Sequence, residues 1–240
     1  MSIVENLCNI KSGIDRILSI DHEVIVRPAN DIKLTTDKRL HDYICESIAS
    51  FSDLPIVSEE SPLNFKEIDL TRSYWIIDPL DGSFNFHRKI PYYCISICLM
   101  EGNVPTKGWI YDPINDAIFW TDNDKNSYKN SSRITCSAEV QKSAGVLLTG
   151  FPSGMKKEEV LNEASSVYQN FSKVRMIGSA SLSLCMVASG KAEAYYEHGI
   201  YLWDVAAGIT LVRNAGGFVK MEKIAGMKYD VYASNGSINE

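Results

Sequence analysis

The chain has 240 residues, of which 45% are apolar and 22% are charged, and its formal net charge is −6. This length and balance indicate one large domain or two closely packed halves, and they exclude a disordered chain. The acidic balance argues against binding to nucleic acid, which requires a basic surface. It leaves room for a small phosphorylated substrate, because bound cations can reverse the local charge.

The apolar residues and cysteines predict a soluble cytoplasmic protein with no membrane partner. The first twenty residues carry charged side chains and lack the apolar segment of a signal peptide. The longest apolar stretch, residues 92–100, is about half of a membrane span. The cysteines have no zinc-site spacing and are expected to be reduced, mostly buried side chains: Cys8, Cys45, Cys94, Cys98, Cys136 and Cys185.

Residues 1–145 are predicted to form an α+β portion that contains an antiparallel sheet and most of the chemistry-bearing motifs. Apolar residues at helical spacing predict one amphipathic helix up to Leu18 and a second helix from about Thr36. Apolar runs bounded by turn residues predict strands at 24–26, 54–57, 73–77, 92–100, 104–111 and 117–121.

The pattern changes after residues 122–132, a polar stretch expected to form an exposed loop or a hairpin. Beyond it the predicted elements are strands at 146–149 and 192–196 and helices at 156–171, 179–188 and 204–214. Residues 146–240 are therefore expected to form an α/β portion. Because no flexible linker separates it from residues 1–145, the two portions are expected to pack as one catalytic unit with a layered α/β architecture.

Two aspartates, Asp78 and Asp81, follow an apolar strand in the segment Asp78-Pro79-Leu80-Asp81-Gly82-Ser83. Pro79 and Gly82 favour a tight turn, so the two carboxylates can converge, and converging carboxylates repel unless a cation lies between them. Hard oxygen ligands favour Mg²⁺, Mn²⁺ or Ca²⁺ over zinc. Backbone N–H groups near Ser83, where a helix can begin, are suited to bind phosphate. The alternative is an ordinary Asp-Pro-x-Asp-Gly turn.

Two further acidic segments raise the odds of a metal site. Glu59 and Glu60 end another predicted strand, and Asp204 begins a predicted helix among small residues. Each has an ordinary alternative: the glutamates can form a solvated turn, and Asp204 can be a helix N-cap. All three acidic segments are less readily explained by chance than any one of them.

These motifs resemble the inositol monophosphatase family of magnesium-dependent, lithium-sensitive phosphatases. They occur in order as Glu59-Glu60, Asp78-Pro79-Leu80-Asp81-Gly82-Ser83 and Trp203-Asp204-Val205-Ala206-Ala207. Two more segments resemble the substrate pocket of the family: Arg175-x-Ile177-Gly178-Ser179-Ala180 and Ala194-Tyr195-Tyr196-Glu197-x-Gly199-Ile200. The resemblance extends from about Asp31 to Asn235, and it implies an alternating α-β-α-β-α sandwich.

The resemblance also implies a site with two or three Mg²⁺ ions. The implied metal ligands are Glu59, Asp78, the Leu80 carbonyl, Asp81 and Asp204, and the implied catalytic residues are Glu59, Asp37 and Ser83. The implied substrate contacts are Asp81, Gly82, Ser83, Gly178, Ser179, Ala180, Glu197 and Asp204. Ser83 replaces the usual threonine of the family but keeps its hydroxyl, whereas Lys33-Leu34 departs from the Val-Thr pair that usually precedes Asp37.

The reaction implied is hydrolysis of a phosphomonoester by metal-activated water, with Asp37 orienting Ser83. Asn85-Phe86 and Glu197 favour myo-inositol 1-phosphate as the substrate. The alternatives are fructose-1,6-bisphosphatase and 3′(2′),5′-bisphosphate nucleotidase activity. An alternative of another class is a non-catalytic scaffold that binds a protein partner such as the transcription machinery. The resemblance further implies a homodimer.

Two other patterns carry no predicted site. Asp122-x-Asp124-x-Asn126 begins like a calcium loop, but Ser127 and Arg133 stand where that loop requires glycine and glutamate. The four histidines share no metal-ligand spacing and are not expected to be catalytic: His22, His41, His87 and His198.

Overall fold

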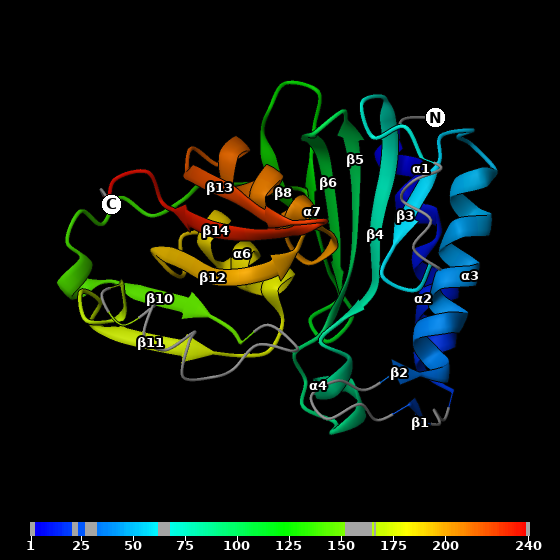
Figure 1. The fold of residues 1–240 in the computed structure, drawn as a ribbon, viewed down its shortest axis with the longest axis horizontal. Coiled ribbons are helices and arrows are strands. Elements are labelled where there is room, and N and C mark those ends of the chain that lie inside the picture. Colours follow the sequence, from blue (N-terminus) through cyan, green and yellow to red (C-terminus); the bar gives the residue numbers. More distant parts are fainter. Residues whose placement is uncertain are drawn as a thin grey trace.

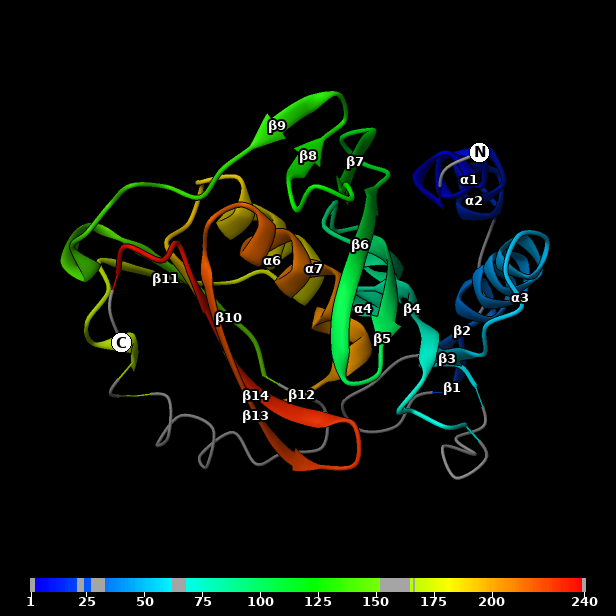
Figure 2. The ribbon, with the colours of Figure 1, turned by 90° about the horizontal axis from the view of Figure 1, so that it is seen from above.

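Helices and sheets alternate in layers through the structure, as the view from above shows (Figure 2). It is a computed structural model that describes residues 3–20, 24–26, 33–61, 68–151, 165 and 167–238. Helices near the N-terminus cover one face of a seven-stranded sheet, and two central helices fill the space between that sheet and a five-stranded sheet. Four layers, in the order helix, sheet, helix, sheet, therefore lie within the described residues.

The N-terminal layer consists of three helices, α1 (Ile3–Asn9), α2 (Lys11–Leu18) and α3 (Thr35–Ala49). The helix predicted up to Leu18 is interrupted at the single residue Ile10, which keeps α-helical dihedral angles. The Ile10 N–H donates to the Leu7 carbonyl in a tight turn, and the Tyr43 hydroxyl on α3 donates to the Ile10 carbonyl. The Tyr43 ring lies against Gly13, where a larger side chain has no room. These contacts hold α2 against α3.

The seven-stranded sheet follows chain order, with β3 parallel to β4 at one edge and every later pair antiparallel. Its predicted strands are confirmed with small differences at their ends, and the polar stretch at 122–132 takes the hairpin form. The strands are β3 (Ile56–Ser58), β4 (Ser73–Asp81), β5 (Cys94–Glu101), β6 (Val104–Asp112), β7 (Ala117–Thr121), β8 (Ser127–Lys129) and β9 (Ser132–Ile134). The predicted strand β1 (Val24–Val26) pairs separately with β2 (Lys33–Leu34).

The five-stranded sheet has the order β11-β10-β12-β14-β13 and mixes parallel with antiparallel pairs. Sequence patterns predicted only two of its strands, β10 and β12, and did not reveal the other three. The strands are β10 (Val146–Thr149), β11 (Lys173–Met176), β12 (Ala194–Tyr201), β13 (Phe218–Ala225) and β14 (Lys228–Ser234). A short 3-10 helix, η1 (Lys142–Ala144), precedes it. The helix predicted at 156–171 lies largely outside the described residues.

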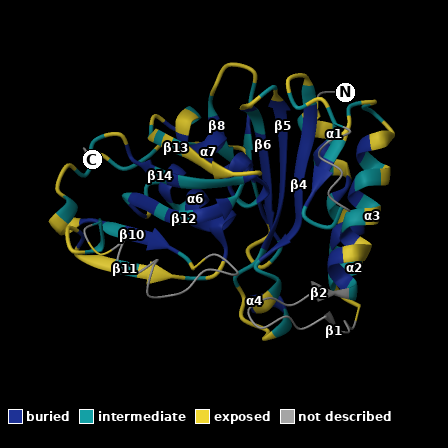
Figure 3. Cartoon of the chain, in the orientation of Figure 1, coloured by how far each residue is buried: buried dark blue, intermediate teal, exposed yellow. Residues whose placement is uncertain are grey.

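The central helices α6 (Ala180–Ala188) and α7 (Leu202–Asn214) are buried along most of their length (Figures 1 and 3). They confirm the helices predicted at 179–188 and 204–214. Their side chains form one apolar cluster with residues of both sheets, so the core runs through the boundary between 1–145 and 146–240. Cys94 and Cys98, four positions apart on β5, join this same cluster. The division into two portions stays a prediction.

In the part of the chain that the structure describes, no helix combines the length and the apolar character needed to cross a lipid bilayer.

Candidate active site

A β-bulge in β4 turns Asp78 and Asp81 toward the same side of the sheet. Asp78 pairs with Ser96 of β5 and Asp81 with Cys94, so three steps along β4 match two steps along β5. In a regular strand, residues three apart point to opposite faces, and the extra residue of a bulge removes that difference. Both aspartates therefore face the central helices. They lie within β4, whereas the prediction placed them after the end of the strand.

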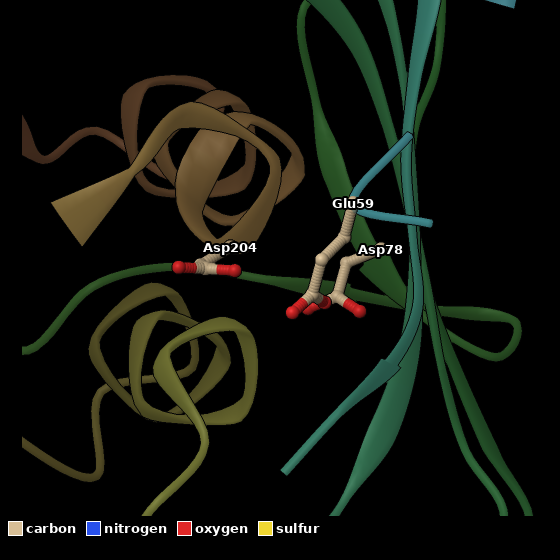
Figure 4. Close-up of side chains that lie close together, drawn as sticks. All are labelled: Glu59, Asp78 and Asp204. Atoms are coloured by element: carbon tan, nitrogen blue, oxygen red, sulfur yellow. The ribbon is translucent and has the colours of Figure 1, made fainter. Parts of the chain in front are cut away.

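Three carboxylates from distant segments meet at this face (Figure 4). Glu59 follows β3, Asp78 lies in β4 and Asp204 lies in the first turn of α7, and each offers an oxygen within 4.8 Å of the others. The Glu59 and Asp78 carboxylates lie side by side, with Asp204 across from them. Tyr201 is the N-cap of α7, which excludes the N-cap alternative for Asp204. Glu59 and Glu60 do lie in a half-buried turn, and the Glu59 side chain joins this cluster.

The carboxylates of this cluster repel one another. Burial, together with the negative charges of Glu59, Asp81 and Asp204, raises the pKa of Asp78 well above its usual value. Burial and nearby carboxylates, with Glu59 the largest contributor among them, raise the pKa of Asp204 well above its usual value. Asp78 is only 1% exposed, so solvent screens it little. An arrangement of this kind is favourable when a cation lies among the oxygens.

Asp81 has different surroundings, because the N-terminus of α6 supplies hydrogen-bond donors to it. The Ser179 hydroxyl and the Ser181 N–H donate to Asp81 Oδ2 over 2.6 Å and 2.7 Å. Burial raises the pKa of Asp81 to about 6, while these hydrogen bonds act in the opposite direction. Ser179 is also the N-cap of α6, accepting from the Leu182 N–H. One side chain thus starts the helix and anchors the aspartate.

The Ser83 hydroxyl links the bulge to α3. Ser83 Oγ lies 2.8 Å from the Leu80 carbonyl oxygen and 3.0 Å from Asp37 Oδ1, and its single proton can be given to either acceptor. Asp37 lies in the first turn of α3 and is 4% exposed. The expected neighbourhood of Asp37 and Ser83 is therefore present, although they are 46 positions apart in the chain.

Two close contacts, at Gly82 and at the Asn85 side chain, fix the positions of the loops around the site. Gly82 has φ +92°, and a Cβ there would lie 3.1 Å from the carbonyl oxygens of Gly178 and Tyr92. Only glycine adopts this conformation at low cost while the segments approach so closely. The buried Asn85 amide on α4 (Ser83–His87) donates to the Ile177 carbonyl at 2.8 Å and to the Tyr92 carbonyl at 2.7 Å. Asn85 therefore fixes the loop before α6 against the end of the Asp-Pro-Leu-Asp segment.

Glu197 lies on β12 on the opposite wall. Its side chain is 6% exposed and accepts a hydrogen bond of 2.7 Å from the Tyr195 hydroxyl. Burial raises the pKa of Glu197 to about 7, while the Tyr195 hydrogen bond lowers it. A side chain at Gly150 would overlap the Glu197 carboxylate, so the glycine keeps space open beside it. The surface-carboxylate alternative for Glu197 is therefore wrong.

Most of these groups border one cleft of about 290 Å³. The predicted site residues in its lining are Glu59, Asp78, Leu80, Asp81, Gly82, Ser83, Gly178, Ser179, Ala180, Glu197 and Asp204, while Asp37 contacts it through Ser83. Tyr195, Ile200 and Trp203, which belong to the recognised motifs, also line it. Other lining residues were not predicted: Phe84, Thr149, Gly150, Phe151, Ser183 and Tyr201. Aromatic residues at strand and helix ends carry no signal by which a cleft wall can be told from a core position.

Comparisons with known proteins give the family of this chain. The model of the inositol monophosphatase family matches residues 9–239. A Nus factor SuhB of Pasteurella multocida is 34% identical over 203 residues, covering 83% of this chain and 75% of its own. Inositol monophosphatase 3 of Solanum lycopersicum is 32% identical over 218 residues, covering 88% and 79% respectively.

Solved structures give the same result for the fold. The suhB protein of Bartonella henselae has a TM-score of 0.83 at 26% identity, over 99% of this chain and 95% of that one. The inositol monophosphatase of Anabaena has a TM-score of 0.79 at 28% identity, over 98% and 93% of the two chains. The expected layered α/β sandwich is thereby confirmed, and the chain belongs to the inositol monophosphatase family.

Proposed function

We propose that this family phosphatase hydrolyses myo-inositol 1-phosphate with the help of divalent metal ions. The observation that carries the proposal is the meeting of Glu59, Asp78 and Asp204 in one cleft, with the buried carboxyl group of Glu197 on the opposite wall. The three carboxylates that repel one another are suited to bind metal ions. The carboxyl group on the far wall is suited to accept a hydrogen bond from a hydroxyl group of the substrate.

The residues present fit magnesium. The donors are all oxygens, as Mg²⁺ prefers, and their mutual repulsion in a buried setting is what a bound cation relieves. In the proposed site Glu59, Asp78 and the Leu80 carbonyl would hold one ion, and Asp78, Asp81 and Asp204 would hold a second. Bound Mg²⁺ lowers the pKa of a water molecule and stabilises negative charge on phosphoryl and leaving-group oxygens.

The side chains around the ions have their own tasks in this proposal. The Ser83 hydroxyl accepts a hydrogen bond from the attacking water. It donates its own proton in a hydrogen bond to Asp37 Oδ1, 3.0 Å away, so the Asp37 carboxylate makes Ser83 a better proton acceptor. The backbone N–H groups of Gly82 and Ser83, at the start of α4, bind phosphoryl oxygens. The Ser179 hydroxyl and Ser181 N–H keep Asp81 in place, so their contribution is to orient a ligand before substrate arrives.

Glu197 supports a polyol substrate. Its Oε2 accepts from Tyr195, which leaves other lone pairs of the carboxylate for a substrate hydroxyl. A carboxylate accepting from a hydroxyl gives discrimination, because a substrate without that hydroxyl leaves the buried group unpaired.

The SuhB relatives are named as Nus factors, which fits the scaffold alternative. The site of this chain favours catalysis instead. A protein that acts only as a scaffold gains nothing from buried carboxylates that repel one another, and their repulsion lowers its stability. A homodimer and a cytoplasmic location remain predictions from the sequence.

The test is phosphate release from a substrate panel with and without Mg²⁺. The panel contains myo-inositol 1-phosphate, fructose 1,6-bisphosphate and adenosine 3′,5′-bisphosphate. We expect release that requires Mg²⁺ and a kcat/KM that is highest for the inositol phosphate. A preference for the sugar bisphosphate or the nucleotide replaces the proposed substrate, and no release from any compound contradicts a catalytic role.

A further inference from the structure

We propose that His41 is a positioning residue, which holds Ser58 so that the neighbouring Glu59 presents its carboxylate to a metal ion. This inference rests on the proposed function, since it assigns a support to one ligand of the proposed metal site. It concerns a histidine that carries no metal-ligand spacing in the sequence.

Glu59 sits where the sheet itself supplies little restraint. It follows β3, a three-residue strand at one edge of the seven-stranded sheet, which pairs on one side with β4. The Glu59 N–H reaches the Ile77 carbonyl at 3.4 Å, the long end of hydrogen-bonding distances. Short edge strands are among the least constrained parts of a sheet. A ligand at such a point needs a further anchor if its carboxylate is to be placed reproducibly.

The anchor is a partly buried hydrogen bond between helix and strand. His41 Nδ1 on α3 lies 2.9 Å from Ser58 Oγ, and Ser58 is 0% exposed. The same Oγ accepts from the Glu60 N–H at 3.3 Å, so the Ser58 hydroxyl also holds the turn that carries Glu59. Because Oγ accepts from this N–H, its own proton is available for Nδ1.

The state of the histidine matches that direction. Burial lowers the pKa of His41 below its usual value, which favours the neutral ring. A neutral ring with its proton on Nε2 presents Nδ1 as an acceptor, and Cys45 Sγ lies 3.7 Å from Nε2. The hydroxyl, the turn N–H and the ring are then satisfied together.

Helix α3 is well suited to be the fixed partner. It buries Leu40, Ile44 and Ile48, each 0% exposed, against the sheet core. Asp37 and His41 lie one turn apart on it, and they contact Ser83 and Ser58 respectively. One rigid helix therefore sets the positions of two points of the metal site that belong to different segments, the Leu80–Ser83 turn and the Ser58–Glu60 turn.

The consequence is a metal affinity that depends on a residue that does not touch the metal. Partners that orient metal ligands typically change metal affinity by 10–100-fold when they are removed. We expect His41→Leu and Ser58→Ala each to weaken Mn²⁺ and Mg²⁺ binding by about tenfold. The double variant is expected to be no weaker than either single variant, because both changes remove the same bond.

The experiment is calorimetric titration of the full chain with Mn²⁺ and with Mg²⁺, below the unfolding temperature of each variant. His41→Asn keeps a side-chain acceptor close to the position of Nδ1 and is expected to bind metal nearly as wild type does. Leu40→Val is the matched control, because it loosens the packing of the same helix without touching Ser58. It is expected to lower Tm while leaving the Kd for metal unchanged.

Each result decides the inference. Wild-type Kd values in His41→Leu and Ser58→Ala overturn it, and so does a His41→Asn variant that binds as weakly as His41→Leu. A Leu40→Val variant with weakened metal binding also overturns it, since helix stability then accounts for the effect. A wild-type protein that binds neither ion contradicts the proposed metal site itself, which is a separate and distinguishable failure.

Discussion

Asp78 and Asp81 lie three positions apart on β4 and line one cleft, but the protein holds their carboxylates in different ways. Asp81 accepts two hydrogen bonds from the start of α6, through the Ser179 hydroxyl and the Ser181 N–H. Asp78 accepts one backbone hydrogen bond, from the Leu80 N–H at 3.0 Å, and otherwise faces the carboxylates of Glu59 and Asp204.

The difference separates two ways of keeping a buried carboxylate. Hydrogen-bond donors of the protein moderate the pKa of Asp81, which burial raises to about 6. The pKa of Asp78 is raised well above its usual value by burial and by the like charges of Glu59, Asp81 and Asp204, and the Leu80 N–H opposes this. Asp81 is therefore held by donors of the fold, whereas the repulsion around Asp78 is what the proposed cation would relieve.

The largest effect is expected for Asp78→Asn. This change removes the carboxylate shared by both proposed ions, so we expect loss of metal binding and a fall in kcat of roughly a thousandfold. Phosphate release and calorimetric Mg²⁺ titration measure the two outcomes. A variant with near-normal turnover would refute the assignment of Asp78.

A smaller effect is expected for Asp81→Asn. One proposed ion loses a ligand, but the segment stays anchored because the amide oxygen can still accept from Ser179 and Ser181. We expect kcat to fall by about a hundredfold, and a phosphate-release assay measures the remaining activity. Equal or larger loss than in Asp78→Asn would erase the proposed distinction between the two aspartates.

Glu197→Gln extends the comparison to the opposite wall. We expect KM for inositol 1-phosphate to rise about tenfold, because a carboxylate acceptor for a substrate hydroxyl is replaced by a neutral amide. KM for fructose 1,6-bisphosphate serves as the comparison. An unchanged KM for the inositol phosphate contradicts the assigned contact.

The same variant tests the pH dependence of stability. Burial raises the pKa of folded Glu197 to about 7 from an ordinary value of 4.5, so between these values the folded state binds more protons than the unfolded state. Stability from this group is complete below pH 4.5 and is lost as the pH rises through about 7. In chelator, the wild-type free energy of unfolding should therefore fall more steeply over this range than that of Glu197→Gln, as measured by urea denaturation.

The smallest effect is expected for Ser179→Ala. It removes the N-cap of α6 and one of the donors to Asp81, which should lower the free energy of unfolding by about 1 kcal/mol. The Ser181 N–H keeps holding Asp81, so turnover should fall only a few-fold. A loss of activity comparable to that of Asp81→Asn would show that Ser179 has a direct part in the chemistry.

Sequence patterns predicted much of the fold where the apolar spacing is regular. The strands of the first sheet and helices α3, α6 and α7 follow from such spacing. Strands β13 and β14 were missed, because β13 is an edge strand with mostly exposed or half-buried side chains and lacks an apolar run. The interruption at Ile10, whose carbonyl accepts from the Tyr43 hydroxyl of another helix, was also missed.

The carboxylates of the site were recognised because their segments carry compact motifs, and the structure brings them together. Their supports were not recognised. The bulge at Asp78–Asp81 arises from pairing with β5, and the bond between His41 and Ser58 joins residues 17 positions apart. Contacts of this kind depend on tertiary packing, so no local pattern in one sequence encodes them.

The most direct test of the central claim compares the unfolding of wild type and Asp78→Asn at pH 8, in chelator and in excess Mg²⁺. Without metal, the variant should be the more stable protein, because one of the repelling charges is gone. With Mg²⁺, wild type should become the more stable one, since only its folded state binds the ion tightly. The account predicts this reversal of order, and the same order under both conditions would contradict it.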